Sequence, residues 1–301
     1  MSTLPVIAAV DGSDDSLVAL DWAFEAALVR EAPLRMVHVQ QYAAWAEPGV
    51  PSAGRPQLED DPVLDAVRRY LAGRGERPET EYLALEGAPS TTLPELGSDA
   101  QLLVLGSRGR GGFAGLLLGS NGMAAARDAE CPVVVVPKPG RQVHDDMTIE
   151  PGPRVVVGLH VDSPDKATLS FAFAEAALRG ARLQVVAAYS WPAHLWTAAP
   201  SQVVPPPVDQ DAVEHETRTL AEGFLAPHRD RHPEVHAESY VAPGDAAGHL
   251  VAASRDANLV VVGRHRRRLL APARMMGSVT QAVLLHAASP VAVVPPAPPE
   301  E

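Results

Sequence analysis

The feature that most constrains the fold is an internal repeat that spans nearly the whole chain. Gly244–Val262 matches Gly87–Leu105 at a constant offset of 157 residues (244 − 87), and Ser289–Pro295 matches Cys131–Pro137 at 158 (289 − 131). A repeat of this length predicts two copies of one domain, and 301 residues give each copy an ordinary domain size. We expect domains at 1–138 and 153–296, a linker at 139–152, and a disordered tail at 297–301.

Each copy is predicted to alternate strands and helices. The first copy has strand-length apolar runs at Val6–Val10, Leu34–Val39, Glu81–Leu85, Leu102–Leu105 and Val133–Val136, with helical patterns between them. Runs that are apolar at every position are typical of strands buried on both faces of a parallel sheet. The pattern predicts an α/β fold of two tandem, doubly wound, five-stranded parallel-sheet domains.

Composition excludes several classes of protein. A formal net charge of −12 argues against a general nucleic-acid binder, which usually has a basic face. The single cysteine, Cys131, rules out an internal disulfide framework and suits a reducing compartment. The N-terminus lacks a signal-peptide pattern, and no uncharged apolar stretch is long enough to cross a bilayer. We therefore expect a cytoplasmic protein with no membrane or nucleic-acid partner.

A glycine-rich loop follows the fourth strand of the first copy. Its pattern is Gly106-x2-Gly109-x9-Gly119-Ser120, and a helix is predicted to begin at Gly119-Ser120. Glycines remove the Cβ atoms that would hold backbone N–H groups away from a phosphate, and a helix N-terminus favours an anion. We expect a phosphate site here, with Ser120 capping the helix and offering its hydroxyl.

Two other phosphate motifs do not explain this loop. No Gly-x-x-x-x-Gly-Lys-Ser/Thr sequence occurs in the chain, so a P-loop is unsupported. Gly109–Ala114 fits the dinucleotide pattern G-x-G-x-x-A, but that motif belongs to the first βα turn of a domain. Here it lies in the last such unit, and the next strand ends Val136-Pro137-Lys138 without an acidic residue.

The glycine pattern, together with Val10-Asp11-Gly12-Ser13 and Cys131–Pro137, resembles the ATP-binding subclass of the universal stress protein family, in its tandem two-domain form. The resemblance implies a Rossmann-like fold of the adenine-nucleotide α-hydrolase type, with Asp11 contacting the ribose and the glycine loop holding the phosphates. Asn121 departs from the hydroxyl-bearing residues common after the family's Gly-Ser. The nucleotide contacts that the resemblance implies come from Asp11, Gly12, Val39, Gly106, Arg108, Gly109, Gly119, Ser120 and Asn121.

The resemblance also implies an assembly. Val133–Val136 and Val291–Val294 are the last strands of their copies and would lie at sheet edges, where an apolar strand invites pairing. In the family such strands pair between subunits. We therefore expect the two halves to pack on each other as a pseudo-dimer within one chain; a homodimer of the whole chain is a further possibility.

The second copy has lost part of the motif. Arg266 stands where Gly109 stands in the first copy, and Gly277 follows Gly263 by 14 residues instead of 13. His160 takes the place of Asp11. We expect the chain to bind about one ATP, in its first half. The weaker set of candidate residues in the second half is Gly263, Gly277, Ser278 and Val279.

Three functions remain open on the sequence alone. The first is an ATP-binding regulatory protein of the stress response, with an unknown protein partner. The second is a slow ATPase or another nucleotide hydrolase of related fold, although the loop shows no catalytic His, Glu or Asp. The third is a nucleotide-independent interaction module. The histidines show no metal-ligand spacing, so no protein metal site is predicted, while Mg²⁺ could accompany the phosphates of ATP.

Overall fold

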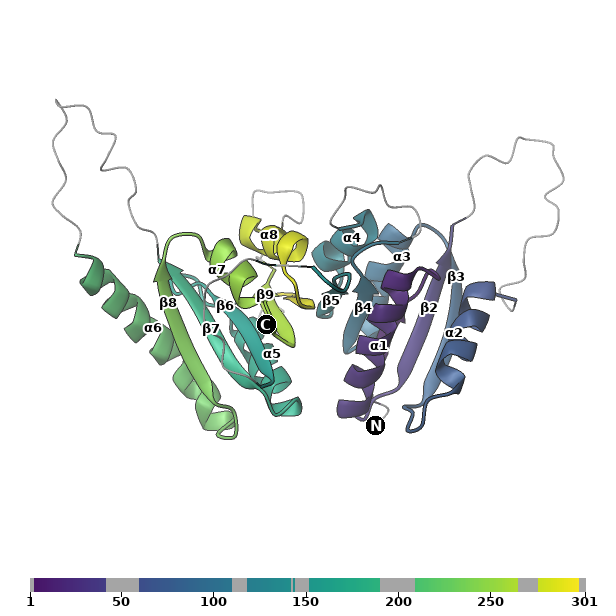
Figure 1. Cartoon of the computed structure of the whole chain (residues 1–301), viewed down its shortest axis with the longest axis horizontal. Helices are drawn as coiled ribbons and strands as arrows, with labels where there is room; N and C mark the ends of the chain where they lie inside the picture. The colour runs from purple at the N-terminus through teal and green to yellow at the C-terminus, as the bar shows by residue number, and fades with distance from the viewer. Residues whose placement is uncertain are drawn as a thin grey trace, which may run out of the picture.

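The computed structural model describes residues 3–41, 60–109, 118–141, 143, 152–189, 209–264 and 276–297. These residues form one ten-stranded sheet in the order β3-β2-β1-β4-β5-β10-β9-β6-β7-β8. Every strand pair within a half is parallel, and the two halves join through the antiparallel pair β5 and β10. The predicted fold class and the pairing of the last strands are confirmed (Figure 1).

The elements of the two halves follow the same order. The first half contains β1 (Val6–Ala9), α1 (Asp14–Val29), β2 (Leu34–Gln40), α2 (Pro62–Ala72), β3 (Thr80–Glu86), α3 (Pro89–Glu95), the 3₁₀ turn η1 (Leu96–Asp99), β4 (Leu102–Gly106), α4 (Ser120–Asp128) and β5 (Val133–Val136). The second half contains β6 (Arg154–Leu159), α5 (Lys166–Leu178), β7 (Arg182–Tyr189), α6 (Gln210–Arg231), β8 (Ala237–Pro243), α7 (Ala246–Ala253), β9 (Leu259–Gly263), α8 (Ser278–His286) and β10 (Val291–Val294).

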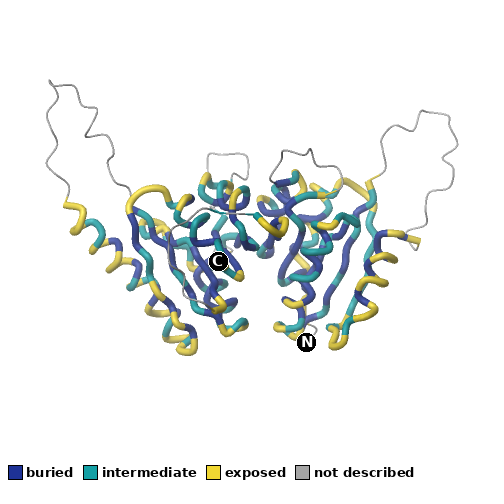
Figure 2. The backbone as a smooth tube through the Cα atoms, in the orientation of Figure 1, coloured by how far each residue is buried: buried dark blue, intermediate teal, exposed yellow. Residues whose placement is uncertain are grey.

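Helices cover both faces of the sheet. One cluster of buried side chains lies between the strands and helices α1, α2, α5 and α6, and includes Leu20 and Phe173. A second cluster lies between the other face and α3, α4, α7 and α8, and includes Ala125 and Leu250. Figure 2 shows that buried residues follow the sheet and that the exposed ones concentrate on the outward sides of the helices. This double cover explains why the strands are apolar at consecutive positions.

The register of the strands relates the two halves residue by residue. Val6 pairs with Leu102 in the first half, and Val155 pairs with Leu259 in the second. Around β1 and β6 the offset is therefore 149 (155 − 6), which places His160 at the position of Asp11, as the sequence predicted.

Arginines tie the two halves together on both sides of the β5–β10 join. Nη1 of Arg264 donates to the carbonyl oxygens of Arg127 (2.7 Å) and Ala129 (2.8 Å), at the end of α4. Nη1 of Arg141 donates to the carbonyl oxygens of Leu285 (2.9 Å) and Ala287 (3.1 Å), at the end of α8. Cations favour helix C-termini, where carbonyl groups lack intrahelical partners. Arg264 of the second half thus caps a helix of the first half, and Arg141, in the segment after β5, caps a helix of the second half.

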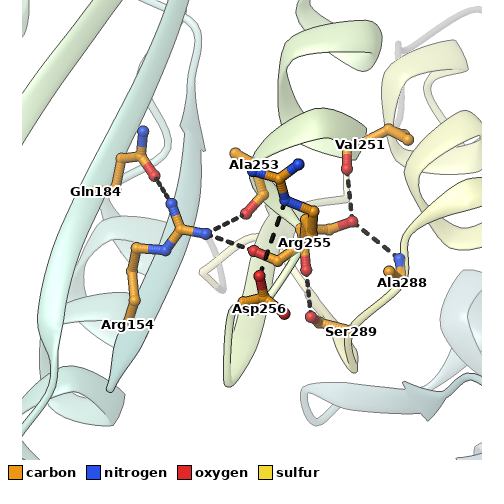
Figure 3. Close-up of polar contacts among 9 residues, drawn as sticks. Arg154, Gln184, Val251, Ala253, Arg255, Asp256, Ala288 and Ser289 are labelled. Carbon is orange, nitrogen blue, oxygen red and sulfur yellow. Dashed lines mark hydrogen bonds and ion pairs between the residues drawn. The ribbon is translucent and has the colours of Figure 1, made fainter. Parts of the chain in front are cut away.

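A polar cluster fixes α7 against the sheet at the amino end of β6 (Figure 3). The buried Arg154 side chain donates from Nη1 to Oε1 of Gln184 (2.7 Å) and from Nη2 to the carbonyl oxygens of Ala253 (2.9 Å) and Arg255 (2.6 Å). Ser254, between the last two, accepts from the backbone N–H of Ala288 at 2.9 Å. The C-terminus of α7 is therefore held by hydrogen bonds at the edge opposite the candidate sites.

None of the helices within the described ranges combines the length and the hydropathy that a membrane span requires.

Candidate ligand sites at the carboxyl ends of the strands

The first-half site lies where the loops after β1 and β4 meet. A Cβ atom built on Gly109 would overlap Oδ2 of Asp11, so the backbone of the glycine loop passes directly against this carboxylate. The two loops follow adjacent parallel strands, whose carboxyl ends share one edge of the sheet. The structure therefore brings Asp11 and the glycine loop together, as the sequence reasoning required.

Asp11 also organises a local turn. Its Oδ1 accepts hydrogen bonds from the backbone N–H (3.0 Å) and hydroxyl (2.6 Å) of Ser13. Gly12 has a φ of +75°, which disfavours residues with a Cβ. The hydroxyl of Ser13 then caps α1 by accepting from the N–H of Ser16 at 3.2 Å. One carboxylate oxygen thus stabilises an Asp-Gly turn, while the other faces Gly109.

The three predicted phosphate-loop glycines have different structural roles. A Cβ on Gly106 would lie 2.7 Å from the carbonyl oxygen of Asp15, so packing of β4 against α1 accounts for that glycine. At Gly119 the nearest described atom, the carbonyl oxygen of Ser107, would be an ordinary contact at 3.6 Å, and φ is −76°. Gly119 is therefore the glycine that neither the described packing nor its backbone conformation requires.

The start of α4 differs from the predicted cap. Gly119 is the N-cap residue, and Ser120 is the first residue of the helix, so the prediction that Ser120 caps it is wrong. The N–H of Gly119 donates to the carbonyl oxygen of Ser107 at 2.8 Å, which commits it within the protein. The following N–H groups, beginning with the exposed Ser120 and Asn121, have no intrahelical partner. An anion at this helix end would meet those groups rather than Gly119.

Charged side chains surround the mouth of the first-half site. Oδ2 of Asp15 lies 3.4 Å from the Ser107 hydroxyl, which donates to it, and 3.6 Å from Nε of Arg108. Burial lowers the pKa of Arg141, and the positive charge of Arg108 lowers it further against the opposing effect of Asp15. The guanidinium of Arg141 itself donates to carbonyl oxygens at the end of α8. Arg110, Gly111 and Gly112, which the glycine loop also contains, lie outside the described residues.

Val39 lies near the end of β2, on the sheet face that α3 and α4 cover, and packs in the same cluster as Leu105. The neighbouring carbonyl oxygen of Gln40 accepts from the N–H of Gly87 at 3.1 Å. These contacts place Val39 at the edge of the site, on the same face as α4.

His38 belongs to a separate polar cluster, which the sequence analysis did not predict. Its Nδ1 lies 2.6 Å from Oδ2 of Asp61, and Nε2 of Gln40 donates to the same oxygen at 2.9 Å. Burial alone would raise the pKa of Asp61, but the bonds from Gln40, His38 and the N–H of Leu64 hold it below its ordinary value. The buried Asp61 caps α2, so the cluster anchors this helix to β2. The sequence did contain a signal for this cap, because an aspartate followed by a proline, as in Asp61-Pro62, is typical of a helix start.

The second half contains a cavity of about 890 Å³ at the equivalent edge of the sheet. Gly263 and Val279 line it, as does His160, while Gly277 and Ser278 are not among its lining residues. Its remaining lining includes Lys166, Thr168, Arg264 and Thr280. The sequence indicates Arg264, which begins a basic run, and Thr280, which belongs to a helix start, whereas it does not single out Lys166 or Thr168. Arg266 lies outside the described residues.

The glycine that opens the second loop is also a packing glycine. A Cβ on Gly263 would lie 2.7 Å from the hydroxyl oxygen of Thr168 on α5. The carbonyl oxygen of Gly263 accepts from the Thr280 hydroxyl at 2.9 Å, which joins β9 to α8. Gly106 and Gly263 therefore serve the same purpose in the two halves.

No group of three or more His, Cys, Asp or Glu side chains that could hold a metal ion occurs within the described ranges.

Comparison with known proteins identifies relatives of the whole chain. The model of the Universal stress protein family matches residues 4–137 and 153–295. Universal stress protein Rv2005c of Mycobacterium tuberculosis (strain ATCC 25618 / H37Rv) is 33% identical over 298 residues, covering 96% of each chain. The crystal structure of a universal stress protein from Archaeoglobus fulgidus DSM 4304 covers 98% of this chain and 99% of its own, with a TM-score of 0.64 and 16% identity. A solved universal stress protein in complex with cAMP is 28% identical, covers 45% of this chain and 98% of its own, and has a TM-score of 0.34.

Proposed function

The chain belongs to the universal stress protein family, and from this premise we propose that it binds an adenine nucleotide, ATP, in its first half and acts as a regulatory protein of the stress response. The nucleotide would lie at the carboxyl ends of β1 and β4, between Asp11 and the start of α4. Its occupancy would change which partner the protein binds.

The observation that carries this proposal is the position of Gly119, where an added Cβ would make only ordinary contacts with the described residues. Neither the described packing nor φ at this position requires a glycine, although both loop neighbours of the same motif, Gly106 and Gly109, pack closely against other atoms. A glycine beside a helix N-terminus lets an anion approach N–H groups that lack intrahelical partners. A bound phosphate group would account for the missing side chain.

The charges near the site suit a nucleotide polyphosphate. Arg108 supplies positive charge within the loop, and Asp15, with Oδ2 3.6 Å from Nε of Arg108, offsets part of it. Arginine pairs with phosphate through two parallel hydrogen bonds. On the other side of the site, the Asp11 carboxylate can accept hydrogen bonds from ribose hydroxyls.

Substitution of Gly119 tests the proposal on the intact protein. Gly119→Val adds a branched side chain where the phosphates would lie, and we expect ATP affinity to fall at least tenfold, about 1.4 kcal/mol. Isothermal titration calorimetry measures the affinity, and circular dichroism checks the fold. Gly277→Val, at the matching helix start of the second half, is the control and should leave the affinity unchanged. Unchanged ATP affinity in a correctly folded Gly119→Val protein would refute the proposal.

A further inference from the structure

We propose that Arg264, which belongs to the second half, is a positioning residue for the nucleotide site of the first half. The inference rests on the proposed function, because it concerns α4, the helix whose start meets the phosphates of the proposed nucleotide. Arg264 holds the opposite end of that helix. The nucleotide site of the first half is therefore complete only when the second half is packed against it.

The backbone of Arg264 is fixed within its own half. The residue follows β9 directly, and its N–H donates to the carbonyl oxygen of Val294 on β10 at 2.8 Å. Its counterpart at the offset of 157 (264 − 107) is Ser107, whose N–H makes the same bond to Val136. The Ser107 hydroxyl stays in its own half and donates to Asp15. The side chain of Arg264 instead crosses the join between β5 and β10.

One nitrogen of Arg264 contacts the carbonyl groups at the end of α4. Nη1 donates to the carbonyl oxygens of Arg127 at 2.7 Å and Ala129 at 2.8 Å, and lies 3.5 Å from that of Ala126. Carbonyl groups in the last turn of a helix lack intrahelical partners, and a cation stabilises them. The C-terminus of α4 is therefore held by a side chain of the other half.

The apolar contacts of α4 come from small residues. The residues that this helix buries are glycine or alanine, namely Gly122, Ala124, Ala125 and Ala126. By contrast, α8 buries Val283 and Leu284, and its Thr280 hydroxyl donates to the carbonyl oxygen of Gly263 at 2.9 Å. Gly122 stands at the position of Thr280 (offset 158, 280 − 122) and cannot make this bond. Because small side chains bury little apolar surface, the bonds to Arg264 carry a larger share of what fixes α4.

The position of α4 matters to a nucleotide because hydrogen bonds tolerate little displacement. The helix has nine residues and is about 13 Å long, at 1.5 Å per residue. It moves as one body, so a C-terminus released from Arg264 displaces the N–H groups of Ser120 and Asn121 at its start. Bonds from these groups to phosphate oxygens need donor–acceptor distances of about 2.7–3.2 Å. Arg264 thus acts on the phosphates through the helix, without touching them.

Two substitutions of Arg264 test the inference on the intact chain. Arg264→Leu removes the donors, and we expect the affinities for ATP and inorganic tripolyphosphate to fall by the same factor, about threefold or more, a usual effect of a charge at a helix end. Arg264→Lys should stay within twofold of wild type, because the contacts above all come from Nη1 and an ammonium carries three donors on one nitrogen. Isothermal titration calorimetry measures the affinities.

Glu175→Gln is the control for a general loosening of the two halves. Glu175 pairs with Arg30 of the first half on the other sheet face, away from α4, so this variant should keep both affinities within twofold. In nucleotide-free protein, hydrogen exchange of the α4 amides should be faster in Arg264→Leu than in wild type, and that of the α8 amides unchanged.

Unchanged affinities in a folded Arg264→Leu protein, an equal loss in Glu175→Gln, or unchanged exchange of the α4 amides would overturn the inference. A wild-type protein that binds neither ligand would refute the proposed function and this inference with it. Binding by wild type that Arg264→Leu leaves intact would refute this inference alone.

Discussion

At the scale of single residues, one carboxylate connects the turn after β1 with the glycine loop. Asp11 fixes Ser13 through Oδ1, and its Oδ2 faces Gly109. The hydrogen bonds of Oδ1 establish a structural role for Asp11, whereas its contact with a nucleotide is a proposal. A substitution that keeps the shape of the side chain while removing its charge separates the two.

We expect Asp11→Asn to weaken ATP binding about tenfold or more, because hydrogen bonds to a charged group contribute about 1.5–3 kcal/mol. Inorganic tripolyphosphate has no ribose, so its affinity should stay within twofold. Gly119→Val, by contrast, should weaken both ligands. Calorimetric titration with each ligand makes the comparison, and equal losses for ATP and tripolyphosphate in Asp11→Asn would contradict a ribose contact.

Sequence spacing identified the glycine loop but could not rank its glycines. Gly106 and Gly119 belong to the same motif, yet a Cβ on Gly106 would clash with the backbone of Asp15, while a Cβ on Gly119 would make only ordinary contacts with the described residues. That difference depends on how α1 packs against β4, which spacing does not encode. The Ser120 prediction failed for a related reason, since a Gly-Ser pair at a helix start does not reveal which residue is the cap.

At the scale of elements, α6 packs on α5 through aromatic rings. The ring of the buried His228 stacks on Phe173 with centroids 5.2 Å apart, and the ring of His232 lies 6.1 Å from Phe173. Nδ1 of His228 is buried without a hydrogen-bond partner among the described residues. Burial lowers the pKa of His228, and the charges of Arg231 and His232 lower it further.

This packing predicts a pH dependence of stability. A histidine whose folded-state pKa is lowered binds fewer protons folded than unfolded, so its stabilising contribution is complete above about pH 6.5. The contribution is lost as the pH falls from there towards the lowered pKa. We expect the Tm of His228→Phe to fall by less than the Tm of wild type between pH 7 and pH 5, as measured in calorimetric scans. An identical fall in Tm for both proteins would contradict the assignment.

The element order was predictable from apolar periodicity, and the start of α1 was predictable to within one residue, because Ser13 and Asp14 are both residues that cap helices. The late start of α5 was not foreseen. Pro164 and Asp165 together move the first helical turn by three residues, because Asp14, the first residue of α1, aligns with Ser163 while α5 begins at Lys166.

At the scale of the whole molecule, a buried ion cluster lies between the two halves. Arg30 at the end of α1 and Arg179 at the end of α5 are equivalent at the offset of 149 (179 − 30), and both form ion pairs with Glu175. The counterpart of Glu175 is Ala26 (175 − 149). One buried glutamate therefore forms ion pairs with two equivalent arginines, and only the second half contains this glutamate.

The cluster can be tested by moving the carboxylate from position 175 on α5 to the equivalent position 26 on α1. Glu175→Ala leaves two mostly buried arginines without their carboxylate, and we expect a loss of about 3–5 kcal/mol. Adding Ala26→Glu to that variant should restore part of the loss, since the new carboxylate reaches the same arginines from the other half. Chemical denaturation measures both, and no recovery in the double variant would contradict the symmetric arrangement.

Sequence analysis predicted that the halves pair through their last strands, because both strands are short, apolar and terminal in their sheets. It did not foresee Glu175, Arg141 or Arg264, which make the pairing specific. Each lies in a segment whose local pattern has an ordinary explanation, and its role depends on a contact with a residue more than 100 positions away.

The central claim is that the chain has a single nucleotide site, which lies in its first half. Calorimetric titration of the intact protein with ATP tests it most directly through the stoichiometry. We expect about one ATP per chain, a site lost in Gly119→Val and kept in Gly277→Val. Two equivalent sites per chain, or one site that survives Gly119→Val, would contradict this account.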